Sequence, residues 1–382
     1  MFQIPLTETT LGEEEIEAAT RVLRSKWVTM GAEVAAFERE FAAAIGTRHA
    51  IAVSNGTVAL EIAYRQAGLG PGDEILLPAI TFVACFNAAR LVGARPVLVD
   101  VTSENDWTMS VADLARKITD RSKVVVPMAH GGFPPDMEGI VRWATKRRLQ
   151  IIEDACHAPL ASVVETKIGA FGLAGTWSFF GNKNMTTGEG GMITTNDDDF
   201  AARCRLARSH GITRPTWDRA QGHAFDYDVA MVGTNARMDE VRAAIGRVQL
   251  AKLPEANRRR GEVTARLRGL VGAIPGVVIP YLRHRGTASY HLFTVLIPAG
   301  VDRRALMAFL KDHGVQTSIH YPPLHHFSGT ASWFAENGGA EDLPVANAIA
   351  GRILTLPLAP TQSPDESQAV AHWLAEGLRA QQ

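Results

Sequence analysis

Short apolar runs alternate with helical patterns through the first half of the chain, and this alternation limits the fold more than any other feature. Strands are predicted at residues 50–53, 74–78, 96–100, 123–127 and 150–154, with helices between them at 57–67, 82–92, 111–118 and 137–146. Strands that are apolar throughout are buried on both faces of a sheet. The pattern therefore predicts an α/β fold with a mostly parallel sheet covered by helices.

Helices are also predicted on either side of this alternating region, at residues 11–24, 32–45, 239–253 and 254–271. Residues 212–232 break the rhythm with Pro, Trp, Gly and His and predict a surface loop or hairpin.

After residue 276 the predicted elements become shorter, with strands at 291–297 and 315–319, a helix at 303–313 and a terminal helix from about Asp365. A change from long helices to short mixed elements indicates a second domain. We therefore predict a large domain over residues 1–255 and a smaller C-terminal α+β domain over residues 256–382.

One lysine, Lys183, stands in the glycine-rich stretch GTWSFFGNKNMTTGEGGMITTN, between an aromatic strand end and a predicted strand at residues 192–195. Poor hydration disfavours the ammonium form and lowers the pKa of a lysine, which makes the amine a nucleophile or a proton carrier. An aldehyde cofactor needs such a lysine for a Schiff base. The alternative is an ordinary solvated lysine, the commoner case for one lysine taken by itself.

Other candidates follow the carboxyl ends of predicted strands, where open α/β sheets bind their ligands. The run from Ser54 to Thr57, with Gly56, begins a helix whose free N–H groups attract an anion, although an ordinary N-cap is the alternative. Asp154 ends the strand QIIED, where a carboxylate can hold a pyridine nitrogen protonated. A cap for the next turn is the alternative for Asp154.

Three further side chains lie close to these positions in the predicted fold. His157 is three residues after Asp154 and can reach the same ligand, although a lone histidine more often packs or caps. Phe82 begins a helix and can stack on a flat ring, or pack in the core. Ser178 ends a strand and can donate to a phosphate, or bond to nearby backbone.

Composition excludes several classes of protein. The chain has 39 lysines and arginines against 40 acidic residues, so no basic surplus indicates a nucleic-acid partner. No apolar run is long enough to cross a bilayer, and the acidic N-terminus does not resemble a signal peptide. Three well-separated cysteines fit a reducing compartment. We therefore expect a soluble cytoplasmic protein that binds neither nucleic acid nor a membrane.

Other catalytic and metal-binding motifs lack the neighbouring residues or elements that their chemistry requires. HGGF at residues 130–133 has no G-x-S-x-G nucleophile elbow to accompany it, and GEGG at 188–191 precedes a strand rather than a helix. Prolines separate His320 from His325 and His326, so these histidines cannot form a helical metal-binding pair. No metal site is predicted.

Several motifs, in this order along the chain, resemble the DegT/DnrJ/EryC1/StrS family of pyridoxal-phosphate sugar aminotransferases. They are SNGTVAL (54–60), PAITFVA (78–84), IIEDACHA (151–158), SFFGNKNMTTGEGG (178–191), RSHGI (208–212), GTNARMDEVRAAIGRVQL (233–250) and SIHYPPLH (318–325). The resemblance extends from about Ile4 to Val370. It implies a fold-type-I aminotransferase that binds pyridoxal 5'-phosphate and works as a homodimer with shared active sites.

The resemblance also implies a role for each candidate. Lys183 would be the Schiff-base lysine, and Asp154 the partner of the pyridine nitrogen. The remaining cofactor contacts would be ring stacking by Phe82, a contact of His157 near the phenolic oxygen, and phosphate binding by Gly56, Thr57, Ser178 and the Asn235 of the neighbouring subunit. Thr29, His320 and Tyr321 would bind substrate.

The implied activity is transfer of an amino group from glutamate or glutamine to a keto sugar by a ping-pong mechanism. RSHGI and the following Trp217 resemble members that aminate a nucleotide-linked 4-keto-6-deoxy sugar. Departures from the family pattern at Ala129 and Thr234 and within residues 163–172 concern the acceptor pocket rather than the chemistry. Open alternatives are a keto-cyclitol or other small ketone as acceptor, an elimination reaction, or a regulatory protein that binds the cofactor without turnover.

Overall fold

A seven-stranded sheet forms the centre of the molecule in the computed structural model, which describes residues 2–214, 222 and 226–381. Its strands are β1 (His49–Val53), β11 (Gly191–Thr195), β10 (Ala174–Ser178), β7 (Gln150–Asp154), β6 (Ser122–Val125), β2 (Glu74–Pro78) and β3 (Arg95–Val99), in that spatial order. β11 is antiparallel to both neighbours, and the other six strands run in one direction. The predicted mostly parallel sheet is confirmed.

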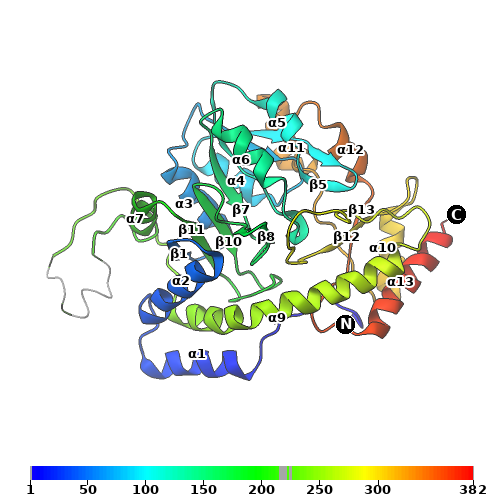
Figure 1. Cartoon of the computed structure of the whole chain (residues 1–382), viewed down its shortest axis with the longest axis horizontal. Coiled ribbons are helices and arrows are strands. Elements are labelled where there is room, and N and C mark those ends of the chain that lie inside the picture. Colours follow the sequence, from blue (N-terminus) through cyan, green and yellow to red (C-terminus); the bar gives the residue numbers. More distant parts are fainter. Residues whose placement is uncertain (1, 215–221, 223–225, 382) are drawn as a thin grey trace.

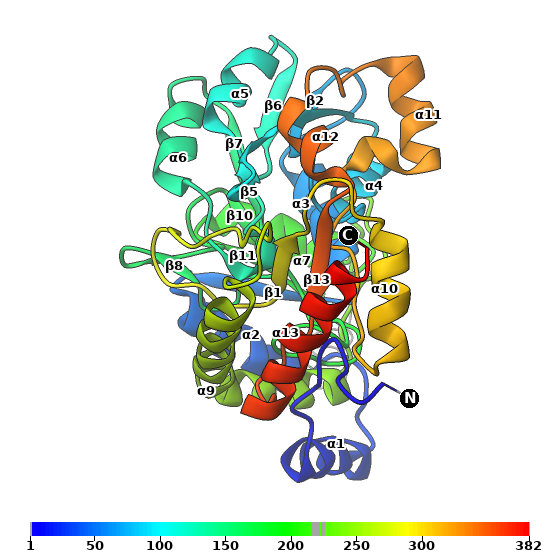
Figure 2. The ribbon, with the colours of Figure 1, turned by 90° about the vertical axis from the view of Figure 1, so that its right-hand side faces the viewer.

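Helices cover both faces of this sheet, as Figure 2 shows. α3 (Gly56–Gln66), α4 (Ala84–Leu91) and α7 (Asp198–Ala207) pack on one face, and α2 (Ala32–Ile45), α5 (Val111–Lys117) and α6 (Met137–Thr145) pack on the other. Alternate strand residues enter the two cores: Ile75 and Leu77 face α3 and α4, whereas Leu76 faces the opposite side. This double burial explains why the strands are apolar throughout.

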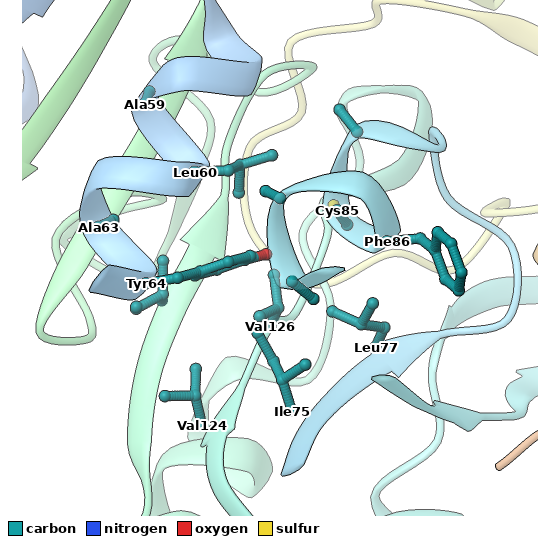
Figure 3. Packing of buried hydrophobic residues seen from close by; sticks show 14 of the residues in the cluster. Ala59, Leu60, Ala63, Tyr64, Ile75, Leu77, Cys85, Phe86, Val124 and Val126 are labelled. Atoms are coloured by element: carbon teal, nitrogen blue, oxygen red, sulfur yellow. The ribbon is translucent and has the colours of Figure 1, made fainter. Parts of the chain in front are cut away.

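Figure 3 shows the core between the sheet and α3 and α4. Leu60 and Tyr64 of α3 lie against Ile75 of β2 and Val126, which follows β6. The Tyr64 hydroxyl points toward α4, which carries Cys85. The packing fixes α3 and α4 against the strands that precede them, and so fixes where each helix begins.

One uninterrupted helix, α9 (Glu240–Val271, 32 residues), replaces the two helices predicted at residues 239–253 and 254–271. Proline lacks an N–H and usually breaks a helix. Pro254 lies inside α9 on its exposed side, where water can satisfy the freed carbonyl. α9 runs along the base of the molecule and packs on α1 (Glu13–Ser25), α2 and α13 (Pro364–Arg379), so tertiary contacts outweigh the lost hydrogen bond (Figure 1).

The C-terminal part has its own small core. β12 (Phe293–Leu296) and β13 (Ile353–Leu356) form an antiparallel pair that packs with α10 (Arg303–Asp312), α13 and the end of α9. The strand predicted at 315–319 is wrong, because this segment makes only the isolated bridges of Val315 with Ile4 and of Ser318 with Thr355. The division into domains at residue 255 falls inside α9 and stays a prediction.

Several short elements were not predicted. Two hairpins pair β4 (Val101–Ser103) with β5 (Asp106–Met109) and β8 (Ser162–Val163) with β9 (Thr166–Lys167). The remaining unpredicted elements are strand β13, helices α11 (Ser328–Asn337) and α12 (Pro344–Ala350), and the 3₁₀ turns η1 (His130–Gly132) and η2 (Leu324–His326). Residues 215–221 and 223–225 of the loop or hairpin predicted at 212–232, Trp217 among them, lie outside the described residues. No described helix has the length and apolar character to span a membrane.

Candidate active site

The candidate residues gather at the carboxyl edge of the sheet because the strands that precede them are parallel. β1 leads to Gly56, β2 to Phe82, β7 to Asp154 and β10 to Ser178. Lys183 lies in the loop between β10 and β11. Residues distant in the sequence therefore meet at one site, as expected for a ligand site in an open α/β fold.

A glycine brings the start of α3 against the end of β10. A Cβ atom on Gly56 would lie 2.8 Å from the Ser178 Cβ, so a larger residue would push the two segments apart. Asn55 is the N-cap of α3, and its Oδ1 accepts the Val58 N–H at 2.9 Å. The N–H groups of the first helical turn and the hydroxyls of Thr57 and Ser178 form a donor set suited to a phosphate. The Phe180 N–H donates to Ser178 Oγ only at 3.4 Å.

Asp154 is a buried carboxylate, 3% exposed. Its Oδ2 accepts the Cys85 S–H at 3.2 Å, and its Oδ1 accepts the Cys156 N–H at 3.2 Å. No described helix starts at this turn, so the bond from the Cys156 N–H caps a turn rather than a helix and occupies only Oδ1. Within the described residues no arginine or lysine forms an ion pair with it. A buried charge needs a cationic partner, and the protonated nitrogen of a pyridine ring would supply one.

Lys183 is partly buried, and burial lowers the pKa of its amine from the ordinary value, with Asp154 and the Cys156 thiol opposing part of that shift. Its backbone N–H donates to the Phe180 carbonyl at 3.0 Å, which closes a turn. The lowered pKa favours a neutral, nucleophilic amine. This environment fits a lysine that binds the aldehyde of pyridoxal phosphate.

Phe82 is half exposed (50%), so it is not a core residue. Its ring lies 5.7 Å from the Tyr321 ring, at an interplanar angle of 50°. An exposed aromatic face at the same edge of the sheet as the Gly56 turn and the buried Asp154 carboxylate suits a flat heteroaromatic ligand. The three features together fit the phosphate, ring and pyridine nitrogen of the cofactor.

His157 and His320 flank the same space. His157 is 1% exposed, and its Nε2 lies 3.0 Å from the Tyr321 hydroxyl. Burial lowers the pKa of His157 well below its usual value, and the neighbouring Lys183 contributes to that shift. His320 Nδ1 lies 3.1 Å from the Thr355 hydroxyl, and burial lowers the pKa of His320 to about 4. Both imidazoles are therefore neutral near pH 7.

Thr29 and Asn235 are exposed. The Thr29 loop is held by Glu240, whose carboxylate accepts the N–H groups of Gly31 and Val34, at 2.8 and 2.9 Å. The Asn235 segment lies along the end of β1, where the Ser54 N–H donates to the Ala236 carbonyl at 2.8 Å. Within the described part of the chain, no hydrogen bond joins either side chain to the Lys183 group.

Two residues of the site were not identified from the sequence. His130 is fully buried, and its Nε2–H donates to the His320 carbonyl at 2.9 Å. The Tyr281 hydroxyl donates to His130 Nδ1 at 2.9 Å. The sequence marks His130 within a hydrolase-like HGGF motif and as the neighbour of Ala129, where many family members carry a histidine. Nothing in the sequence joins it to a tyrosine 151 residues away.

Protonation of His130 should make the protein less stable in acid. Burial lowers the pKa of His130 to about 4, against about 6.5 in an unfolded chain. Between these two pKa values His130 binds a proton in the unfolded chain but not in the folded protein. The contribution of neutral His130 to the unfolding free energy is therefore complete above about pH 6.5 and is lost as the pH falls toward 4. Relative to His130→Gln, which does not titrate, the wild type should lose up to about 3 kcal/mol of unfolding free energy.

Urea unfolding at pH 7 and pH 4.5 measures this difference. Substitution of the exposed His372 by Gln is the control and should leave the pH dependence of the wild type unchanged. Parallel pH dependence in the wild type and in His130→Gln would show that His130 is not held neutral.

Comparison with known proteins gives matches over nearly the whole chain. The model of the DegT/DnrJ/EryC1/StrS aminotransferase family matches residues 9–375. The spore coat polysaccharide biosynthesis protein SpsC of Bacillus subtilis (strain 168) is 35% identical over 370 residues, covering 96% of this chain and 93% of SpsC. The crystal structure of the aminotransferase TlmJ from Streptoalloteichus hindustanus has a TM-score of 0.90 at 33% identity, over 99% of both chains. The crystal structure of DesV from S. venezuelae has a TM-score of 0.89 at 32% identity, also over 99% of both chains.

Proposed function

The chain belongs to the DegT/DnrJ/EryC1/StrS aminotransferase family, and from this premise we propose that it transfers an amino group from glutamate or glutamine to a nucleotide-linked 4-keto-6-deoxy sugar. Membership makes the chain a transaminase that depends on pyridoxal 5'-phosphate. The relative SpsC is a polysaccharide biosynthesis protein, which supports a sugar as the acceptor. The donor and the form of the sugar are our proposal.

The observation that carries the proposal is the proximity of Lys183 to Asp154. A lysine whose pKa is lowered by burial lies within the electrostatic influence of a buried carboxylate that forms no ion pair among the described residues. The helix start at Gly56 supplies phosphate donors beside them, and Phe82 supplies an exposed ring face. This is the set of partners that the aldehyde, the pyridine nitrogen, the phosphate and the ring of the cofactor require.

Bound there, pyridoxal phosphate supplies an electron sink for negative charge at the carbon that carries the amino group. Asp154 would hold the proton on the pyridine nitrogen and so strengthen that sink. The Lys183 amine would act as a proton carrier: it would take the proton from the α-carbon of the donor and return it to the carbon that bore the aldehyde, and it would reverse this transfer to protonate the acceptor carbon in the second half-reaction. The neutral His157 and the Tyr321 hydroxyl orient the groups that react.

We also propose that the protein is a homodimer in which Asn235 reaches the phosphate in the neighbouring subunit. Asn235 is exposed and is not joined to its own Lys183 group by any hydrogen bond among the described residues. Val229 and Val232 are close to Asn235 in the chain and are 57% and 85% exposed. Exposed apolar residues of this kind are typical of an interface. A cytoplasmic location is the setting in which the separated cysteines stay reduced.

A panel of acceptors tests the proposed substrate. The holoenzyme with L-glutamate should aminate a nucleotide-linked 4-keto-6-deoxy sugar, with the amino product identified by mass spectrometry and parallel lines in double-reciprocal plots, as ping-pong kinetics require. The same sugar without its nucleotide and a keto-inositol serve as comparison acceptors. A higher kcat/KM for either of them would contradict the proposal, and the acceptor class would then change while the transaminase chemistry stands.

A further inference from the structure

Four hydrogen bonds link the turn η1 to the residues that face Lys183. The Tyr281 hydroxyl donates to His130 Nδ1 at 2.9 Å, and His130 Nε2–H donates to the His320 carbonyl at 2.9 Å. Tyr321 follows His320, and its hydroxyl lies 3.0 Å from His157 Nε2. The Gly131 N–H in η1 donates to His157 Nδ1 at 3.3 Å. This bond closes a circuit of hydrogen bonds through Tyr281, His130, His320, Tyr321, His157 and Gly131.

The circuit fixes the tautomer of each histidine. A neutral imidazole has one nitrogen that donates and one that accepts. The Gly131 N–H can only donate, so His157 Nδ1 accepts and His157 Nε2 carries the proton. The Tyr321 oxygen is therefore an acceptor from His157, and the phenolic proton of Tyr321 remains available to a ligand.

The Tyr321 hydroxyl is suited to donate that proton as a hydrogen bond. Burial and the nearby Asp154 charge raise the pKa of Tyr321 well above its usual value, so the hydroxyl stays protonated. Its ring lies 5.7 Å from the exposed Phe82 ring at an interplanar angle of 50°, and Asp154 is close enough to influence it electrostatically. The available proton therefore belongs to a group among the candidate site residues.

Tyr281 is held in an unusual backbone conformation. Its φ is +62°, in the left-handed region that a bulky residue rarely adopts. Three contacts secure it: the Tyr281 N–H donates to the Asn105 carbonyl at 2.8 Å, Arg268 donates to the Tyr281 carbonyl at 3.0 Å, and the ring stacks on Phe133 at 4.6 Å. Surroundings that enforce this conformation aim the hydroxyl at His130.

We propose that His130 and Tyr281 are a positioning pair that holds the Tyr321 hydroxyl as a hydrogen-bond donor to the keto oxygen of the acceptor. His130 donates to the carbonyl of His320, the residue before Tyr321. The Gly131 N–H donates to His157, and His157 donates to the Tyr321 hydroxyl. A hydrogen bond to that oxygen polarises the carbonyl for attack by an amine. The inference rests on the proposed function, because the acceptor is a ketone there.

A double-mutant cycle tests the pair. Tyr281→Phe removes one hydroxyl and keeps the ring that stacks on Phe133, and it should lower kcat/KM for the acceptor about 10-fold, the order expected for one lost hydrogen bond to a neutral partner. In a Tyr321→Phe background, Tyr281→Phe should lower kcat/KM almost no further, because the Tyr321 hydroxyl that the pair positions is absent. Tyr290→Phe, which also removes a hydroxyl beside Phe133 but lies outside the circuit, should behave as wild type. Equal losses in both backgrounds would overturn the proposal.

Nitrogen-15 NMR of histidine-labelled protein gives a readout that does not depend on turnover. His130 and His157 should both appear as neutral rings protonated at Nε2, and Tyr281→Phe should shift the His130 signals while the unfolding temperature changes little. A charged or Nδ1-protonated His157 would contradict the circuit whatever the acceptor. Intact NMR signals without amination of any ketone would instead contradict the proposed function.

Discussion

Lys183→Ala should abolish transamination, with kcat lower by a factor of about 10⁴ or more. The amine is the group that binds the cofactor aldehyde and carries the proton, and loss of both nucleophilic and general-base catalysis has effects of this order. The side chain is only partly buried and makes no ion pair among the described residues, so folding should be almost unaffected. Initial rates with glutamate and a keto-sugar acceptor measure the loss, and circular dichroism checks the fold.

A variant that keeps the positive charge but lacks the amine tests which of the two is needed, and an exposed lysine serves as the control. Lys183→Arg keeps a cation near Asp154 but cannot bind an aldehyde, and it should be as inactive as Lys183→Ala. Lys311→Ala, on the exposed face of α10, should retain full activity. Residual activity in Lys183→Arg above one hundredth of the wild-type rate would mean that another group carries the proton.

Asp154→Asn should lower kcat by about 10³-fold while the protein still binds the cofactor. The amide cannot stabilise a protonated pyridine nitrogen, and removal of one well-placed electrostatic partner costs 10²- to 10³-fold in other enzymes. The Cys156 N–H and the Cys85 S–H both donate to the present carboxylate, so one of them would face the new amide N–H₂. Rates of the two half-reactions, followed by stopped-flow absorbance, should both fall.

Glu153, the residue before Asp154 in β7, gives a matched control for Asp154→Asn. Successive strand residues face opposite sides of a sheet, so the Glu153 carboxyl group faces away from the side that carries Asp154. Glu153 is buried and accepts the N–H groups of Gly169, Phe171 and Gly172, and burial raises its pKa to about 7. Glu153→Gln should therefore lower the unfolding free energy by about 1–3 kcal/mol and leave kcat nearly unchanged. If Glu153→Gln lost as much activity as Asp154→Asn, the role of Asp154 would be structural.

Much of the sheet was predictable because its strands are buried on both faces and carry an unbroken apolar signal. β7 and its terminal Asp154 match the prediction, and the parallel direction of the strands then brings the ends of β1, β2 and β10 to one edge. The hydrophobic pattern thus predicts the edge of the sheet at which the candidate residues lie. Short motifs around Gly56 and Lys183 added the chemistry.

Other features depend on contacts that no local pattern encodes. α9 continues through Pro254 because α1, α2 and α13 pack along it, and propensity alone predicts a break there. The bond between Tyr281 and His130 needs a left-handed tyrosine, a conformation that the sequence does not signal. Thr29 and Asn235 stay predictions, since a single chain does not bring them to Lys183.

The visible absorption spectrum of the purified holoenzyme, before and after L-glutamate, tests the central claim most directly. Pyridoxal phosphate bound to Lys183 should give a yellow band that glutamate bleaches to the spectrum of pyridoxamine phosphate, and the Lys183→Ala protein should lack that band before glutamate is added. Wild-type protein that shows no band after incubation with pyridoxal phosphate, or a band that Lys183→Ala retains unchanged, would contradict the assignment of Lys183 and of the site built around it.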